Sequence, residues 1–119
     1  MSHNDGGWIG VDLDGTLAQY DGWQGPEHIG DPVPAMLGRV KEWLAAGREV
    51  RVLTARVHSR TSHNNREHAR NIITAWCVKH VGLALIVTSE KDYAMIELWD
   101  DRCVQIEPNT GRRMDGKED

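Results

Sequence analysis

Four short apolar runs in this 119-residue chain are each followed by polar residues that can do chemistry. Two segments of helical periodicity lie between the first three runs, so strands and helices alternate. This alternation predicts a parallel sheet with helices packed on it through right-handed crossovers. In such sheets ligands bind beyond the carboxyl ends of the strands. We therefore expect these residues to meet at one edge: Asp12, Asp14, Thr54, Lys91, Asp100 and Asp101.

The predicted strands are short. They span residues 8–11, 49–54, 83–87 and 93–99, with a possible edge strand at 103–106. The run at 83–87 is continuously apolar, as is typical of a strand covered on both faces of a parallel sheet.

Two helices are expected between these strands. The first begins at Pro34 and is closed by Gly47 as a C-terminal cap. The second begins at Asn64, which has the form of a capping box with the glutamate three positions on, and is closed by Gly82. Before the first helix, residues 17–33 are dense in glycine and proline, which predicts a loop or a small hairpin rather than a helix.

The size of the chain fits one domain, predicted at residues 1–106, with a polar tail at 107–119. The formal net charge of −4 argues against a protein whose whole surface holds nucleic acid, although a local basic patch remains open. No apolar run approaches the ~18 residues of a membrane span, and residues 1–7 lack the apolar core of a signal peptide. We expect a cytoplasmic protein with no membrane partner. Cys77 and Cys103 lie in apolar stretches and are expected to be buried free thiols.

The first polar cluster suggests phosphate chemistry. Asp12 and Asp14 lie two positions apart at a strand end, so both carboxylates can point to one side. Asp12 can attack a phosphate ester and form an aspartyl-phosphate, while Asp14 protonates the leaving oxygen and later activates water. A carboxylate is repelled by phosphate, so the site needs a hard cation such as Mg²⁺, held by Asp12 with Asp100 or Asp101. The alternative is that the Asp-Gly pair only makes a turn.

Two weaker candidates and a basic stretch accompany these acids. Lys91 can neutralise phosphate charge, and the Thr54 hydroxyl can donate a hydrogen bond to a phosphate oxygen. Their alternatives are a solvated loop lysine and a capping hydroxyl. Residues 56–70 interleave arginines with histidines and form either a basic rim that favours a substrate with further phosphates or a solvated surface. The histidine spacing does not suit a zinc site.

The whole pattern resembles the haloacid dehalogenase superfamily of hydrolases, over roughly residues 8 to 106. Its four motifs are matched by Asp12-Leu13-Asp14-Gly15-Thr16, by Val52-Leu53-Thr54, by Lys91 and by Asp100-Asp101. Lys79 is the other central candidate for the third motif.

This resemblance implies an α/β fold, namely a Rossmann-like three-layer sandwich with a central, mainly parallel sheet and no large cap domain. It implies a phosphatase in which Mg²⁺ is held by Asp12, by the Asp14 backbone carbonyl and by Asp100 or Asp101. The resemblance places Gly15, Thr16, Thr54 and Lys91 at the substrate. The start of the basic stretch adds Arg56.

The substrate is less defined than the chemistry. The leading hypothesis is a phosphomonoesterase that acts on nucleotides or nucleic-acid 3′ ends, because the acidic pair followed by Arg102 resembles the phosphatase half of polynucleotide kinase/phosphatase proteins. One alternative is a phosphatase of sugar phosphates or other small metabolites whose site is completed by oligomerisation. Another is a non-catalytic phosphate-binding module.

Overall fold

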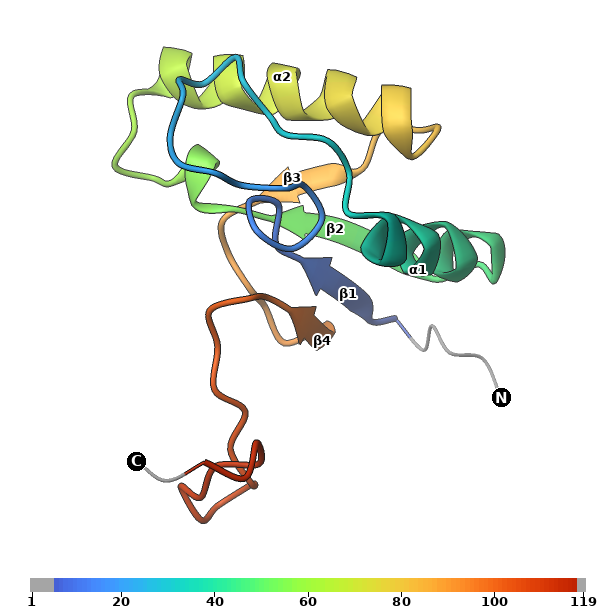
Figure 1. The fold of residues 1–119 in the computed structure, drawn as a ribbon, viewed down its shortest axis with the longest axis vertical. Helices are drawn as coiled ribbons and strands as arrows, with labels where there is room; N and C mark the ends of the chain where they lie inside the picture. The colour runs from blue at the N-terminus through green and yellow to red at the C-terminus, as the bar shows by residue number, and fades with distance from the viewer. Residues whose placement is uncertain (1–5, 118–119) are drawn as a thin grey trace.

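The computed structural model describes residues 6–117. Residues 1–5, which belong to the segment tested for a signal peptide, and residues 118–119, which belong to the predicted polar tail, lie outside the described part. The predicted α/β class is confirmed: the chain forms a four-stranded, all-parallel sheet in the order β3-β2-β1-β4 (Figure 1). The strands are β1 (Trp8–Val11), β2 (Glu49–Leu53), β3 (Ile86–Thr88) and β4 (Met95–Trp99). The helices are α1 (Pro34–Ala45), the 3-10 helix η1 (Ala55–Val57) and α2 (His63–His80).

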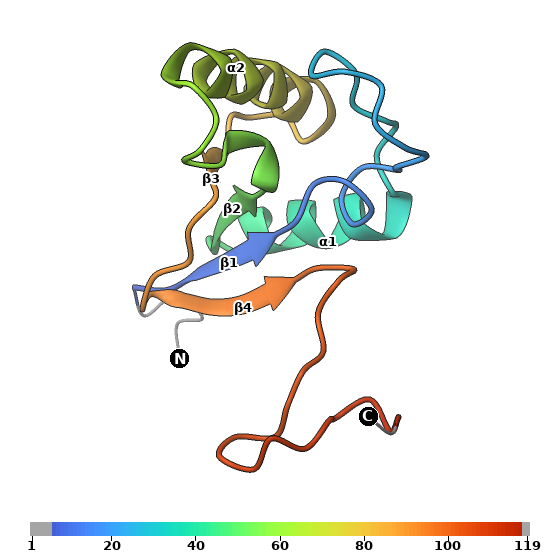
Figure 2. The same cartoon turned by 90° about the vertical axis from the view of Figure 1, so that its left-hand side faces the viewer.

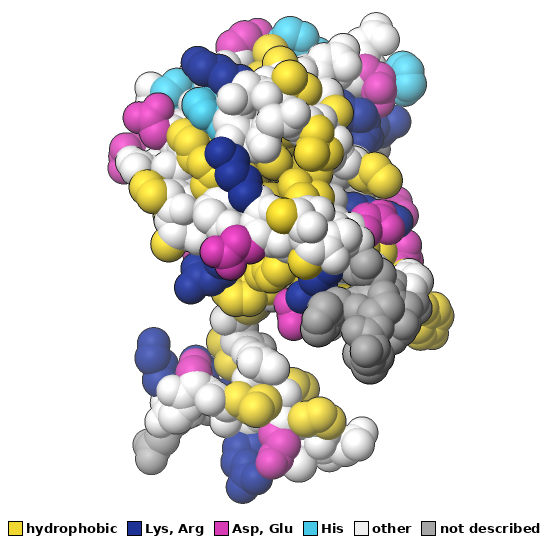
Figure 3. Space-filling model, turned by 90° about the vertical axis from the view of Figure 1, so that its right-hand side faces the viewer, with side chains coloured by type: hydrophobic (Ala, Val, Ile, Leu, Met, Phe, Trp, Pro, Cys, Tyr) yellow, Lys and Arg dark blue, Asp and Glu magenta, His cyan; other side chains and the backbone are white. Residues whose placement is uncertain are grey.

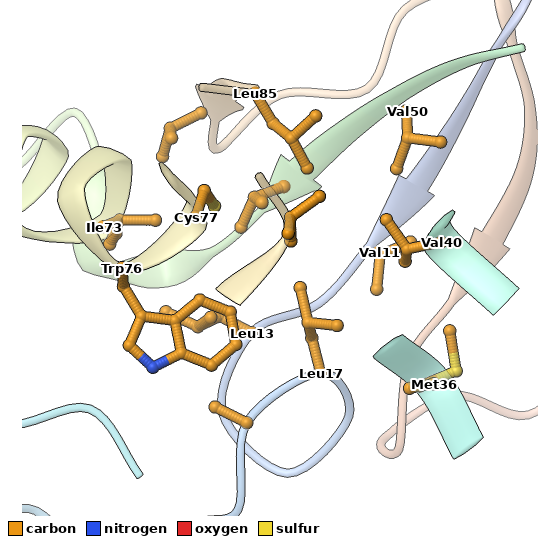
Figure 4. Close-up of a cluster of buried hydrophobic side chains, with 14 of the residues drawn as sticks. Val11, Leu13, Leu17, Met36, Val40, Val50, Ile73, Trp76, Cys77 and Leu85 are labelled. Carbon is orange, nitrogen blue, oxygen red and sulfur yellow. The ribbon is translucent and has the colours of Figure 1, made fainter. Parts of the chain in front are cut away.

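Both α-helices pack on one face of the sheet. Alternate residues of β1 and β2, among them Val11 and Val50, share a single core cluster with Val40 of α1 and Ile73 of α2 (Figure 4). The chain moves in the same direction from β1 to β2 and from β2 to β3, which places right-handed crossovers on the same side. Among residues 6–117 no helix covers the other face, so the structure contains two layers of the predicted three.

The second face of the sheet is partly covered by Trp8. This residue is only 1% exposed, and its Nε1 donates to Asp92 Oδ1 at 2.8 Å. The Arg51 guanidinium lies 4.6 Å from the ring centroid. Gly10 makes room for this packing, because a Cβ there would come within 3.1 Å of the Trp8 ring.

Most strand boundaries are close to those predicted, but β3 differs. It begins at Ile86 rather than at residue 83, and Ile86 is 55% exposed. The expectation of coverage on both faces is wrong, because β3 is an edge strand whose outer face carries no helix. Strand β2 ends at Leu53 and β4 begins at Met95, each slightly shorter than predicted.

The predicted start of α1 at Pro34 is confirmed, and Gly47 follows the helix with φ of +82°. The predicted start of α2 is wrong by one residue, and its cap is Ser62, whose Oγ accepts a hydrogen bond from Asn65 N at 3.3 Å. Asn64 already lies inside the first turn and does not serve as the cap. Within residues 6–117 no helix combines the length and apolarity needed to cross a membrane.

Residues 19–31, here called the excursion, leave the end of β1, approach α2 and return to α1 (Figure 1). As predicted, this segment contains no helix, and an antiparallel bridge between Ala18 and Pro32 closes its base. Gly30 is required there, because a Cβ would come within 2.1 Å of the Gln19 carbonyl oxygen. Trp76 Nε1 of α2 donates to Gly30 O at 3.0 Å, which fixes the excursion against the helix.

The segment after β4 stands apart from the sheet (Figure 2), and in the space-filling view it forms a separate lobe (Figure 3). The predicted edge strand at 103–106 is wrong, since Ile106 instead forms an isolated bridge with Arg113. Hydrogen bonds from Met114 N to Gln105 O and from Glu107 N to Arg112 O close a local hairpin. The prediction of two buried thiols holds for Cys77 only, because Cys103 lies on this segment and is exposed.

Candidate active site

The acidic centre lies where β1 and β4 end side by side. Asp12 follows β1 directly, and its backbone N–H donates to Trp99 O at 2.9 Å, which holds it beside the end of β4. Asp12, Asp100 and Asp101 each offer a carboxylate oxygen, and these oxygens lie within 4.8 Å of one another. The parallel register of the two strands therefore brings together acids that are far apart in sequence.

The surroundings of Asp12 disfavour its charged form. Burial, together with the negative charges of Asp100 and Asp101, raises the pKa of Asp12 to about 7. The cluster is thus a concentration of negative charge with oxygen donors only, which is the donor set that Mg²⁺ and Ca²⁺ prefer.

The turn after Asp12 is shaped to meet Asp101. Gly15 has φ of +89°, and a Cβ at this position would come within 2.6 Å of Asp101 Oδ2. Thr16 Oγ1 donates to Asp101 Oδ1 at 3.1 Å and accepts from Asp101 N at 3.0 Å. Gly15 and Thr16 were expected at the substrate, and the structure places both against Asp101.

Asp14 is held by Arg56 in a two-pronged ion pair. Arg56 Nε donates to Asp14 Oδ2 at 2.7 Å, and Nη2 donates to Asp14 Oδ1 at 2.8 Å. The Arg56 side chain is 7% exposed, and that of Asp14 is 21% exposed. The same guanidinium donates to the carbonyl oxygens of Pro26 and His28 in the excursion. Arg56 therefore links the end of β2 to Asp14 and to the excursion.

Thr54 is buried at the end of β2. Its backbone N–H donates to Thr88 O at 2.8 Å, and its Oγ1 accepts from Arg56 N at 3.1 Å. The hydroxyl thus caps η1, which was the alternative to phosphate binding, and its proton remains available to a group in the cavity.

A cavity of about 820 Å³ opens over these strand ends. Six of the residues predicted from the sequence line it: Asp12, Asp14, Thr54, Arg56, Asp100 and Asp101. Ser89, which follows β3, lines it as well. The carboxyl ends of all four strands thus contribute to one cavity.

Both candidate lysines lie elsewhere. Lys91 is exposed in the connection between β3 and β4 and is not among the lining residues, and Lys79 is exposed near the end of α2. The basic stretch is divided. Arg56 faces Asp14, Arg66 donates to the carbonyl oxygens of Ser59 and Thr61, and Arg70 donates to the Val87 carbonyl oxygen.

The excursion contributes lining residues that the sequence patterns did not single out, notably Tyr20 and Trp23. Trp23 lies against Arg56, with the guanidinium carbon 4.9 Å from the ring centroid. The one available signal was the presence of two aromatic residues in a segment rich in glycine and proline, where nothing in the periodicity assigns them to a core.

Comparisons with protein-family models, with curated proteins and with solved structures each find no match for this chain. The function proposed below therefore rests on the geometry of the site and on the motif resemblance.

Proposed function

We propose that this chain is a Mg²⁺-dependent phosphomonoesterase of the haloacid dehalogenase type, with a Rossmann-like arrangement that lacks a large cap domain. The observation that carries the proposal is the convergence of Asp12, Asp100 and Asp101 within 4.8 Å, beside Asp14, at the carboxyl end of a parallel sheet. This is the place where sheets of this kind bind ligands.

The donor set fits a divalent cation. Asp12 would hold Mg²⁺ together with Asp100 or Asp101. The positive charge of the cation would compensate the negative charges of Asp100 and Asp101, which raise the pKa of Asp12. When bound, Mg²⁺ supplies charge neutralisation that lets an anionic nucleophile approach an anionic phosphate. Thr16, which exchanges two hydrogen bonds with Asp101, keeps that carboxylate at the centre.

The residues of the chain then divide the reaction between them. An Asp12 oxygen attacks phosphorus, the bond to the ester oxygen breaks, and an aspartyl-phosphate forms. For this step one Asp14 oxygen has to leave Arg56 and take up a proton from solvent, and Asp14 then gives that proton to the departing oxygen. Asp14 then takes a proton from water, which attacks phosphorus and releases inorganic phosphate and free Asp12. Arg56 fixes the orientation of Asp14 through two hydrogen bonds and is a positioning residue.

Hydrolysis of p-nitrophenyl phosphate tests the proposal. We expect turnover that needs Mg²⁺, that stops with a chelator and that returns when Mg²⁺ is restored. The matched variants are Asp12→Asn, which removes the nucleophile, and Asp21→Asn, which makes the same change at an exposed position of the excursion outside this cavity. Turnover that survives chelation would contradict the mechanism. Equal turnover rates in the Asp12→Asn and Asp21→Asn variants would contradict it as well. Phosphate binding without turnover would favour the non-catalytic module.

A further inference from the structure

We propose that Trp23, together with Tyr20, binds the base of a nucleotide, so that the substrates of this site are phosphomonoesters of nucleosides, either free or at the end of a nucleic acid. This inference rests on the proposed phosphomonoesterase function and names its substrate class. It is carried by three properties of the excursion: where its aromatic side chains lie, how they are held and how much of them is exposed.

The aromatic side chains lie in the wall of the same cavity as the acidic centre. Tyr20, Trp23 and Pro26 line it from the excursion, whereas Asp12 and Asp100 line it from the strand ends. The cavity of about 820 Å³ falls in the range of roughly 300–1,000 Å³ that is usual for small-molecule sites. A phosphate group at the acidic centre therefore leaves room for a substituent that reaches the excursion.

Trp23 is exposed although the chain buries its other tryptophans well. Trp23 is 59% exposed and Tyr20 is 42% exposed, while Trp8 and Trp76 are buried and Trp43 and Trp99 are half-buried. An indole left open to solvent in a cavity wall is available to a planar partner. Bases stack on such rings in nucleotide-binding proteins.

The ring of Trp23 is also held in place. The Arg56 guanidinium lies 4.9 Å from its centroid and is itself fixed by its two hydrogen bonds to Asp14. Further hydrogen bonds from Arg56 to Pro26 O and His28 O hold the flanking backbone. A single guanidinium thus separates the indole from the Asp14 carboxylate. A nucleotide has a matching layout, since one ribose separates its base from its phosphate.

The charges along the cavity suit such a ligand. Arg102, which lines the cavity beside the acidic pair, and the bound cation of the proposed function both favour an anionic ester. The excursion contributes aromatic and proline surface rather than a set of hydrogen-bonding side chains for sugar hydroxyls. This wall favours a base over a bare sugar phosphate.

The test compares two substrates that differ only by the base, adenosine 5′-monophosphate and ribose 5-phosphate. We expect the wild type to favour the nucleotide in kcat/KM by roughly 5- to 150-fold, the range that base–aromatic stacking covers. Trp23→Leu should bring that ratio close to one, and Trp23→Phe should keep most of it, because Phe retains a ring. Tyr93→Ala, which removes a fully exposed aromatic side chain outside the cavity, should leave the ratio unchanged.

Equal kcat/KM for the two substrates in the wild type, or a ratio that Trp23→Leu does not lower, would overturn the inference. So would a preference for glucose 6-phosphate over the nucleotide, which would indicate a sugar phosphatase. A 3′-phosphorylated tetranucleotide separates the two sources of the base. If kcat/KM is higher for this tetranucleotide than for the mononucleotide, the substrate is a nucleic-acid end. If it is lower, the substrate is a free nucleotide. Stacking of the base on Trp23 is required in both cases.

A binding measurement separates failure of the inference from failure of the proposed function. Calorimetric titration of the Asp12→Asn variant with the same two ligands, in the presence of Mg²⁺, reports base recognition without turnover. In one outcome the wild type hydrolyses no phosphate ester, but the nucleotide binds more tightly than ribose 5-phosphate and Trp23→Leu removes this difference in affinity. The hydrolase function then fails and base binding stands. If hydrolysis occurs but both ligands bind equally, base binding fails and the hydrolase function stands.

Discussion

Replacing Arg56 by alanine should destabilise the protein far more than an ordinary surface substitution. The change removes both hydrogen bonds to Asp14, the two bonds to Pro26 O and His28 O, and the contact with the Trp23 ring. It also leaves the Asp14 carboxylate, which is only 21% exposed, without its counter-charge.

The magnitude follows from the burial of the pair. Hydrogen bonds to a charged group contribute about 1.5–3 kcal/mol each, and losing one partner of a fully buried pair costs about 3–5 kcal/mol. Because Asp14 keeps some contact with water, which replaces part of what is lost, we expect Arg56→Ala to lower the free energy of unfolding by about 3 kcal/mol. Arg56→Lys should fall between this variant and the wild type, since an ammonium keeps the charge but cannot form the planar two-pronged contact.

Urea denaturation followed by circular dichroism measures this difference. Arg60→Ala is the matched control, because it removes the same charge four positions along, from an exposed residue, and should change stability by about 0.5 kcal/mol or less. If Arg56→Ala and Arg60→Ala unfold at the same urea concentration with the same slope, Arg56 does not hold Asp14 and the excursion together, and its role as a positioning residue is refuted.

Four further substitutions probe the acidic centre and Asp14. Asp12→Asn should abolish turnover and, in metal-free buffer above pH 7, raise the melting temperature. The folded-state pKa of about 7 lies above the ordinary aspartate value of 3.8, so the Asp12 charge opposes folding as the pH rises through this window; a lower melting temperature would contradict this assignment. Asp14→Asn should lower kcat on an alkyl phosphate by roughly 10²- to 10⁴-fold, and a wild-type rate would remove Asp14 from proton transfer. Asp100→Ala should weaken Mg²⁺ binding more than Asp101→Ala in a calorimetric titration, since Asp100 is the first residue beyond β4, and the reverse order would make Asp101 the direct ligand.

The order of strands and helices, and the residues that end the strands, were readable from the sequence. Apolar runs and helical periodicity are local properties, and they located β1 and the start of α1 to the residue and the other observed helices and strands to within a few positions. Because parallel strands present their carboxyl ends at one edge, the same pattern predicted that Asp12, Thr54 and Asp100 would meet, and the cavity contains all three.

The sequence was less informative wherever coverage by distant residues decides the outcome. The apolar run of β3 suggested burial on both faces, but the run by itself does not show whether a helix exists to cover the outer face. Cys103 was expected to be buried for the same reason, yet it lies on a segment that leaves the sheet. Burial of a residue depends on other segments that pack against it. An apolar run shows only that such packing would be favourable, not that a segment exists to provide it.

The sequence by itself determined the chemical content of the site, because strand ends carry their polar residues wherever the sheet forms. Only the tertiary structure decided how those residues are paired. Arg56 and Asp14 are 42 positions apart, and they meet because β1 and β2 are adjacent parallel strands whose carboxyl ends lie side by side. Trp23 faces the cavity because the excursion is fixed to α2 and to Arg56. Such contacts have no local signature, since they depend on where an irregular segment comes to rest against elements encoded elsewhere in the chain.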